Sequence, residues 1–555
     1  MRKIRSTQQR QLVEETQQDD LAEGIGYVDR LVELNAEEAE RQIAYHLNRW
    51  LEIRGGLDDG ASLPDLFKPL NAIVDQGELE RRFSQTQFDR TDILHLRNAF
   101  LFSRMVEHID SPESMHDDPL LSDWLKSVRQ QQGDKVADQL TTATRLADWL
   151  FRNIAWVPMQ IGATAKPSEV PDGMVHEGPG YRQTVFQTAM RGRGDWMQRS
   201  RLFVELCYQA NLDGLLVGIN LNPAEVADPW AAGVAIGGEV YLFDFETGIF
   251  VPGPGGVGIA TLSQARRDAS VMRRMKVPGF FDYPIDKETL SSCIAILPVK
   301  PEAASPRLKL LNDSLTGKLR FRTHIDLPAL VQRVDNAGGI SGVRLWEVPL
   351  QAEVYQAAME KSADRDANFA VFYRGKWAML EEKFPSSERL KTARWRQLKG
   401  EFAENEEDGS QGARTLLLLS RSPEFEIDDL RTNVDLQNDY GVRRQANTTP
   451  EEYDRQIRAV QSLFRMTKRT ATYWISLMQY DDGRFDDASN WFSQRVLLDD
   501  QQNVWGNSAK YNLARTYERL GKIDKAIEIY KTQGISNEHG HRIRARLLGK
   551  QDDES

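Results

Sequence analysis

Two stretches decide the fold of this chain: Gly192-Arg-Gly-Asp-Trp-Met-Gln-Arg-Ser-Arg-Leu-Phe-Val-Glu-Leu-Cys-Tyr-Gln-Ala-Asn-Leu-Asp-Gly-Leu-Leu-Val-Gly-Ile219 and Pro229-Trp-Ala-Ala-Gly-Val-Ala-Ile-Gly-Gly-Glu-Val-Tyr-Leu-Phe-Asp-Phe-Glu-Thr-Gly248. Asp195 stands before an apolar run of helical spacing, where a helix N-cap is expected. A strand follows, and then two apolar runs flank Gly237-Gly238, which predicts a β-hairpin ending at Asp244. Together the two stretches predict an α+β unit, in which one helix packs on an antiparallel sheet.

This order of helix, strand and hairpin resembles the core of the transglutaminase-like superfamily, which is related in fold to papain-type thiol enzymes. In such proteins a helix commonly precedes the core, and helical spacing over about 120–156 predicts one here. Its apolar stripe consists of Leu146, Trp149, Leu150 and Ile154, and its other face of Asp148, Arg152 and Asn153.

The residues that carry the family's chemistry are replaced. The resemblance implies a nucleophilic Cys in the first turn of the core helix, with a His and an Asp on the two hairpin strands. This chain has Trp196 at the Cys position and Ala231 at the His position, and it retains only Asp244. An indole ring cannot form the acyl intermediate that a thiolate forms. The resemblance therefore implies the fold without its usual reaction, and it predicts no catalytic residues.

At the same place a cleft is expected, floored by Trp196 with Trp230 and Asp244 nearby, and these three are the predicted binding residues. Trp196 either fills the former nucleophile's place or offers its ring face and indole N–H to a bound peptide or glycan. Asp244 either orients a ligand or caps the turn at Thr247-Gly248.

A thiol site with relocated residues is the alternative. Cys207 lies about three helical turns, roughly 16 Å, beyond Trp196, in an apolar context typical of a buried residue. The chain has no histidine between His176 and His324. His176, in the loop before the core, is therefore the only nearby candidate for a general base.

The composition describes an ordinary globular chain. It has 555 residues, 40% of them hydrophobic and 28% charged, which is enough for several domains. Its formal net charge of −11 opposes unspecific binding to nucleic acid. Two cysteines, Cys207 and Cys293, cannot form a disulfide framework, and His539 and His541 alone do not make a metal site. No cofactor, metal or nucleic-acid partner is predicted.

No run of about 18 apolar residues is present, so no membrane span is expected. The basic first ten residues are not followed by the apolar segment of a signal peptide. A cytoplasmic location is the default expectation, and export or anchoring would require a segment upstream.

Four regions are expected: helices over 1–120, the transglutaminase-like core over 121–262, a mixed α/β region over 263–440 and a helical region over 450–555. The first helical pair is expected to break near Gly24 and Gly26. The mixed region either continues the core or forms a second domain. Alternation over 318–327 predicts a half-buried strand with His324 facing solvent. Further strands are predicted over 343–348, 369–373 and 415–419.

The last region contains an internal repeat. Three positions recur with one constant offset. Gly483 corresponds to Gly521, Ala488 to Ala526 and Phe492 to Tyr530. Small, small and aromatic residues at this spacing resemble the packing positions of tetratricopeptide repeats (TPRs), in which two helices approach closely. Two units fall short of the three or so that a free array needs, so they are expected to lean on helices over 451–466 and 541–548. The repeats either serve packing alone or form a peptide-binding groove.

Two main functions follow from these features. The first is a non-enzymatic protein-interaction or scaffold protein, which binds a protein or peptide partner through the TPR-like region and through the core cleft. The alternative is a cysteine-type hydrolase or transglutaminase-like peptidase with relocated catalytic residues. A structural subunit of a larger complex is a third possibility.

Overall fold

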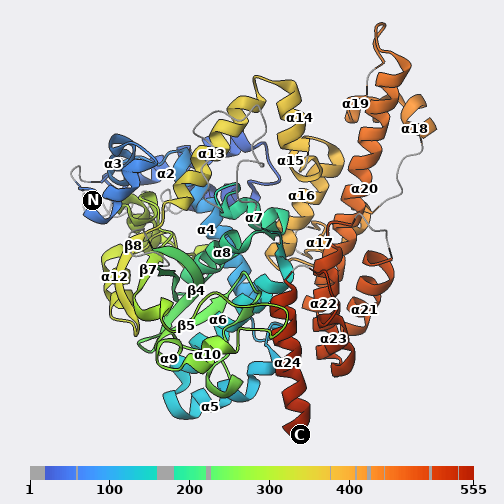
Figure 1. Ribbon diagram of the computed structural model, residues 1–555. Helices are drawn as coiled ribbons and strands as arrows, with labels where there is room; N and C mark the ends of the chain where they lie inside the picture. Colours follow the sequence, from blue (N-terminus) through green and yellow to red (C-terminus); the bar gives the residue numbers. More distant parts are fainter. Residues whose placement is uncertain are drawn as a thin grey trace.

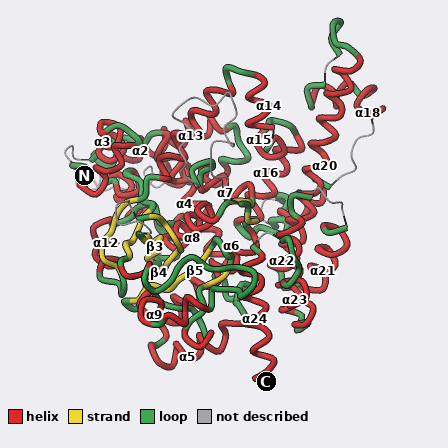
Figure 2. The backbone as a smooth tube through the Cα atoms, viewed as in Figure 1, coloured by secondary structure: helices red, strands yellow, loops and turns green. Residues whose placement is uncertain are grey.

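The computed structural model describes residues 19–57, 61–158, 180–220, 227–375, 377–406, 409–421, 427–442, 444–498, 503–535 and 537–554. The fold is a mixed α+β arrangement in which helices predominate around one small sheet (Figures 1 and 2). Among the described residues the sheet has six strands in the order β6-β5-β4-β3-β7-β8, and β1 and β2 form a separate two-stranded sheet. In the described residues, none of the helices is both long enough and apolar enough for a bilayer.

The predicted helix and hairpin are confirmed. Helix α8 spans Trp196–Gln209 and begins at a capping box, in which Asp195 accepts from the Gln198 amide and the Gln198 side chain accepts from the Asp195 amide. Strand β3 (Asp213–Ile219) pairs antiparallel with β4 (Asp228–Ile236), and β4 pairs antiparallel with β5 (Glu239–Asp244). Gly237 and Gly238 both have positive φ, which the tight turn between β4 and β5 requires.

The sheet extends past the predicted end of the core at residue 262. Strand β7 (Cys293–Leu297) pairs antiparallel with β3, and β8 (Ile340–Leu345) pairs parallel with β7. On the opposite edge β6 (Ile249–Phe250) pairs with β5. The first part of the mixed region therefore contributes two strands to the same sheet as the core hairpin.

The N-terminal region is helical as predicted, but the predicted break is wrong. Residues 19–30 form one helix that includes Gly24 and Gly26, and the chain turns only before α2 (Ala36–Ile53), which Asn35 caps. Leu47 packs 3.3 Å from the place where a Gly24 Cβ would lie, so the glycine serves close helix packing. The next helices are α3 (Gln76–Ser84), α4 (Arg90–Ile109), α5 (Ser122–Gln132) and α6 (Asp134–Asn153).

Three of the predicted strands in the mixed region are wrong. Residues 369–373 and 415–419 lie in helices α14 (Ala367–Gly375) and α17 (Ala413–Ser420). Residues 320–326 form neither strand nor helix, although Phe321, Thr323 and Ile325 are buried as the alternation predicts. His324 is half-buried, not solvent-facing. Strand β8 covers the start of the predicted strand over 343–348.

The remaining helices and short strands complete the body and its edges. They are β1 (Ala155–Trp156), α7 (Val185–Arg191), β2 (Arg193–Gly194), α9 (Leu262–Arg267), α10 (Ala269–Arg273), α11 (Pro306–Ser314), α12 (Leu327–Asp335), α13 (Val348–Ala363), α15 (Ala378–Glu381), α16 (Pro385–Leu398), α18 (Ile427–Thr432) and α19 (Val434–Asp439).

The C-terminal region consists of helical hairpins. It comprises α20 (Pro450–Asp481), α21 (Phe485–Trp491), α22 (Gly506–Arg519), α23 (Ile523–Tyr530) and α24 (Glu538–Glu554). The first half of α20 projects from the body with α18 and α19, and we call these three segments the arm (Figure 1).

The repeat positions occupy equivalent places in two successive hairpins. Gly483 and Gly521 both have positive φ directly after the C-caps of α20 and α22. Ala488 and Ala526, and likewise Phe492 and Tyr530, are fully buried between the paired helices, as the spacing predicts.

Candidate functional site

The residues predicted to form the core cleft are all buried. Trp196 is 6% exposed and Trp230 is 6% exposed, while Ala231 lies inside β4 opposite Val217. Among the described residues no hydrogen bond or ring contact joins Trp196 to Trp230 or Asp244. Trp196 therefore fills space at the start of α8, and its ring face is not open to a ligand.

Tyr283, which the sequence did not single out, brings Trp230 and Asp244 together. The Trp230 indole N–H donates to the Tyr283 hydroxyl at 2.7 Å, and this hydroxyl donates to Asp244 Oδ2 at 2.6 Å. Trp230 is the extra residue at a bulge in β4, because Val217 pairs with Ala231 and Gly218 with Pro229. The bulge thus turns the indole toward Tyr283.

Asp244 also caps the turn that follows β5. Its Oδ1 accepts from the amides of Glu246 and Thr247 at 2.9 and 3.1 Å. Burial raises the pKa of Asp244, and the hydrogen bonds from Tyr283 and from the Thr247 amide oppose that rise. The carboxylate is occupied by the protein on both oxygens, which fits a structural role.

Replacing Tyr283 with phenylalanine is expected to lower the free energy of unfolding at pH 7 by about 1 to 3 kcal/mol, because a buried indole N–H and a carboxylate oxygen lose their partner. The loss should shrink as the pH falls, because the variant raises the Asp244 pKa further and a protonated carboxyl needs fewer donors. Urea unfolding at pH 4.5 and pH 7 measures both effects. Tyr45→Phe, at a 55% exposed residue, is the control. An equal effect from both substitutions would contradict a structural role for the buried hydrogen bonds of Tyr283.

Neither cysteine is placed for nucleophilic chemistry. Cys207 and Cys293 are free and fully buried. Burial raises the pKa of Cys207 well above its ordinary value and that of Cys293 to about 11. The Cys207 side chain lies against Gly214 on β3, at the far end of α8 from Trp196. His176 lies outside the described residues.

A network of buried charges fastens the C-terminal hairpins to the core. Its members are His116, Asp118, Asp148, Arg152, Asp481, Arg515, Glu518 and Arg544, all less than 10% exposed. Arg152 on α6 donates to Asp148 at 2.9 Å and to Asp481 on α20 at 3.0 Å. Arg515 on α22 lies 2.8 Å from Asp148. The polar face of α6, which could pass for a solvated surface, is therefore buried against α20 and α22.

The second half of the network ties α24 to the body. Arg544 meets both oxygens of Asp118 at 2.8 Å and both oxygens of Glu518 at 2.6 and 2.7 Å. Burial acts to raise the pKa of Asp118, but Arg544 and Arg515 outweigh it and hold the pKa below its ordinary value. Because α6 fills the side of α20 and α22 that faces the core, this side is not an open peptide groove.

Two members of this network, His116 and Asp481, form with the neighbouring His108 a group that has the composition of a metal site. Ligand atoms of His108, His116 and Asp481 lie within 4.8 Å of one another. The Arg152 guanidinium, however, donates to His116 Nδ1 and to Asp481 Oδ1. Burial and then Arg152 lower the pKa of His116 well below its ordinary value, so its neutral ring accepts this hydrogen bond. The residues present suit a guanidinium cation at this place rather than a metal ion.

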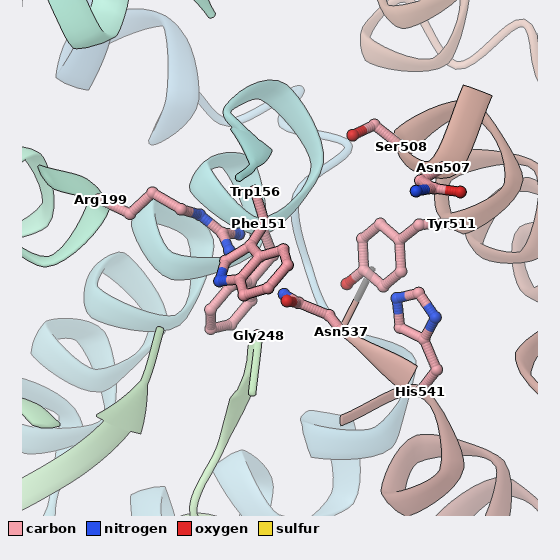
Figure 3. Close-up of a pocket in the computed structure, with 9 residues that line it drawn as sticks. All are labelled: Phe151, Trp156, Arg199, Gly248, Asn507, Ser508, Tyr511, Asn537 and His541. Atoms are coloured by element: carbon pink, nitrogen blue, oxygen red, sulfur yellow. The ribbon is translucent and has the colours of Figure 1, made fainter. Parts of the chain in front are cut away.

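A small pocket lies where the core meets the C-terminal hairpins (Figure 3). It is lined by Phe151, Trp156, Arg199, Gly248, Asn507, Ser508, Tyr511, Asn537 and His541. The cavity has a volume of about 20 Å³, which suits a water molecule or a group of a few atoms. The sequence gives no signal for this site, because the lining comes from α6, β1, α8, the turn after β5, α22 and the residues at the start of α24.

His541 is a neutral member of this lining. It is 5% exposed and stacks on Tyr511 at a ring-centre distance of 5.1 Å. Burial lowers its pKa to about 3, and the nearby positive charges of Arg199 and Arg544 act in the same direction, whereas Glu538 opposes it. The imidazole is therefore uncharged at neutral pH.

The His541→Phe variant is expected to resist acid better than the wild type. An unfolded histidine takes up a proton below about pH 6.5, whereas folded His541 does not until about pH 3. The wild type should therefore lose about 1.4 kcal/mol relative to the variant per pH unit between these values. Urea unfolding of both proteins from pH 7.5 to pH 4.5 measures the difference, and a pH-independent difference would contradict a buried neutral His541.

Comparison of the chain with protein-family models, with curated proteins and with solved structures gives no match.

Proposed function

We propose that this chain is a non-enzymatic interaction or scaffold protein, built on a degenerate transglutaminase-like core with TPR-like hairpins. The observation that carries the proposal is Trp196, a buried indole at the start of α8 where the family places its thiolate. The burial of both cysteines adds to it, because a buried thiol with a raised pKa is a poor nucleophile.

The arm is the surface that we assign to a protein partner. After its acidic first turn, which contains the exposed Glu451 and Glu452, helix α20 has five further exposed residues on the arm, namely Arg455, Arg458, Ala459, Ser462 and Arg465. No acidic residue occurs between Arg455 and Arg469, although the chain as a whole carries a net charge of −11. A basic face on a projecting helix suits an acidic protein surface. The hairpins beyond the arm serve as its rigid base, because the buried network joins them to α6.

Co-purification from the native cells tests the arm. The full-length tagged wild type is compared with the double variant Arg455→Glu/Arg458→Glu and with Arg129→Glu, which reverses an exposed charge on α5. We expect a partner to be recovered with the wild type and with Arg129→Glu and to be lost with the double variant. Recovery of the same proteins with all three, or of none, would count against the proposal.

Thiol labelling tests the enzyme alternative. Iodoacetamide is expected to leave Cys207 and Cys293 unmodified in the native protein and to modify both after unfolding in urea, because both side chains are fully buried. Mass spectrometry of the two samples gives the extent of modification. Rapid labelling of Cys207 in the native protein would favour a relocated thiol site instead.

A further inference from the structure

The pocket between the core and the C-terminal hairpins contains a buried cation that forms no ion pair with the described acidic residues, although Asp244 is near enough to favour its charged form. Arg199 is 1% exposed, and its terminal nitrogens donate to the backbone oxygen of Phe245 at 3.2 Å and, at a long 3.5 Å, to that of Leu150. Its guanidinium carbon lies 5.6 Å from the Phe151 ring centre and 5.8 Å from that of Phe245. Burial lowers the pKa of Arg199 to about 10, so it remains charged at neutral pH. A buried charge of this kind is costly unless something compensates it.

Several polar atoms of the lining lack partners in the part of the chain that the structure describes. They are Arg199 Nε, Trp156 Nε1, Asn537 Oδ1 and His541 Nδ1. Arg199 Nε and Trp156 Nε1 can only donate, and a neutral imidazole can carry its proton on Nδ1. Asn537 Oδ1 accepts as placed, but a half-turn of the side-chain amide puts its NH₂ donors at the same position. Figure 3 shows Arg199, Phe151 and Trp156 on one side of the pocket, Tyr511 and His541 on the other, and Asn537 between them. The lining is thus rich in donors.

A helix N-terminus adds to the positive character of the pocket. Asn507 and Ser508 lie in the first turn of α22, a helix of 14 residues. Its N-cap residue, Trp505, makes no capping hydrogen bond with its side chain. The N-terminal end of a helix attracts anions through its backbone amides and its dipole.

From this geometry we propose that the pocket binds a carboxylate group, held by Arg199 and Trp156 on the core side and by Asn537, His541 and the start of α22 on the hairpin side. A carboxylate is compact and planar, and it accepts hydrogen bonds on both oxygens, as the donor-rich lining requires. The group comes either from a free small carboxylate or from the C-terminal carboxylate of a peptide. The pocket binds it whether or not the arm binds a protein.

Binding is tested by calorimetry on the full-length protein in phosphate-free buffer. The probes are acetate, inorganic phosphate, and trialanine with either a free or an amidated C-terminus. We expect saturable binding of acetate or of the free peptide, and none of the amidated peptide. Acetate binding as strong as that of the free peptide assigns a free carboxylate, and a clear preference for the free peptide assigns a peptide terminus. Binding of phosphate alone, or of no probe, would overturn the proposal.

Variants locate the binding in this pocket. Arg199→Met is expected to weaken binding at least tenfold. Arg201→Met is the matched control, because Arg201 is also buried on α8 but does not line the pocket. Asn537→Gly should weaken binding several-fold and should fold, because Asn537 has a φ of 62°, which glycine adopts readily. If Arg199→Met does not fold, Asn537→Gly decides the matter. Binding unchanged in Asn537→Gly and in any folded Arg199 variant would refute the assignment.

Discussion

Replacing Arg544 with leucine is expected to lower the free energy of unfolding by about 3 to 5 kcal/mol, the usual cost of removing one partner from a buried ion pair. Arg544 is 3% exposed and is the only residue that meets both oxygens of Asp118 and both oxygens of Glu518 among the described contacts. Without it, Glu518 retains the hydrogen bond from the Tyr530 hydroxyl and a more distant ion pair with Arg515 at 3.5 Å. Asp118 retains an ion pair with Arg515 at 3.7 Å. Two buried carboxylates then lose most of their compensation.

The exposed pair of Arg129 with Asp134 and Asp138 provides the control. Arg129 also meets two carboxylates, at 2.7 and 2.6 Å, but it is 47% exposed. Arg129→Leu should therefore change stability little, because solvent screens such pairs. Urea unfolding gives the free energies, and hydrogen exchange shows whether the amides of α24 lose protection in Arg544→Leu. Similar small effects from both substitutions would mean that the network does not hold α24.

The core was predictable because its signals are local. Asp195 and Gln198 form a capping box that can be read from the sequence, and Gly237-Gly238 joins two alternating runs. In the segment 369–373 the local signals point to the wrong structure. Its aromatic and β-branched residues favour a strand, yet it lies in α14, where Phe369 is buried against α13 residues such as Met359. A short apolar run has no intrinsic preference strong enough to resist tertiary packing.

The segment 320–326 separates burial from strand formation. Its alternation correctly predicts which side chains are buried, but partners other than a strand satisfy its backbone. The Thr323 amide donates to Asn312 Oδ1, and the Ile325 amide donates to the Ala303 oxygen. The alternation in a sequence indicates which side chains are buried. The partners of the backbone hydrogen bonds, by contrast, depend on segments that are distant in the chain.

The pocket and the charge network could not be predicted for a related reason. Asp148 and Arg152 lie on the face of α6 opposite its apolar stripe, which in an isolated helix would be the solvated face. They are buried because Asp481 and Arg515, more than 300 residues later in the sequence, complete their ion pairs. Charged residues alone do not distinguish a solvated helix face from a buried one. Water stabilises the charges in the first case, and complementary charges on a distant helix stabilise them in the second.

Gly540→Ala is expected to cost about 3 kcal/mol or more, at the upper end of the range for overpacking in a close-packed region. A Cβ built on Gly540 would lie 1.8 Å from the Thr247 carbonyl oxygen, in the turn that Asp244 caps. Backbone at a capped turn cannot swing aside as the end of a long side chain can. The substitution should therefore force α24 away from the core and widen the pocket between Gly248 and His541.

Gly549→Ala is the matched control, because it makes the same change in the same helix. Among the described residues, no atom other than the nearby backbone of α24 itself lies within 4 Å of a Cβ at Gly549, so alanine should stabilise α24 by up to about 1 kcal/mol through its higher helix propensity. The two variants thus differ in the sign of the expected effect, which urea unfolding measures directly. Stabilisation by both substitutions would show that α24 does not touch the turn after β5, and the pocket would then lose one of its walls. Destabilisation by Gly540→Ala alone would establish the contact between α24 and the turn after β5, which brings Gly248 and His541 together in the pocket lining.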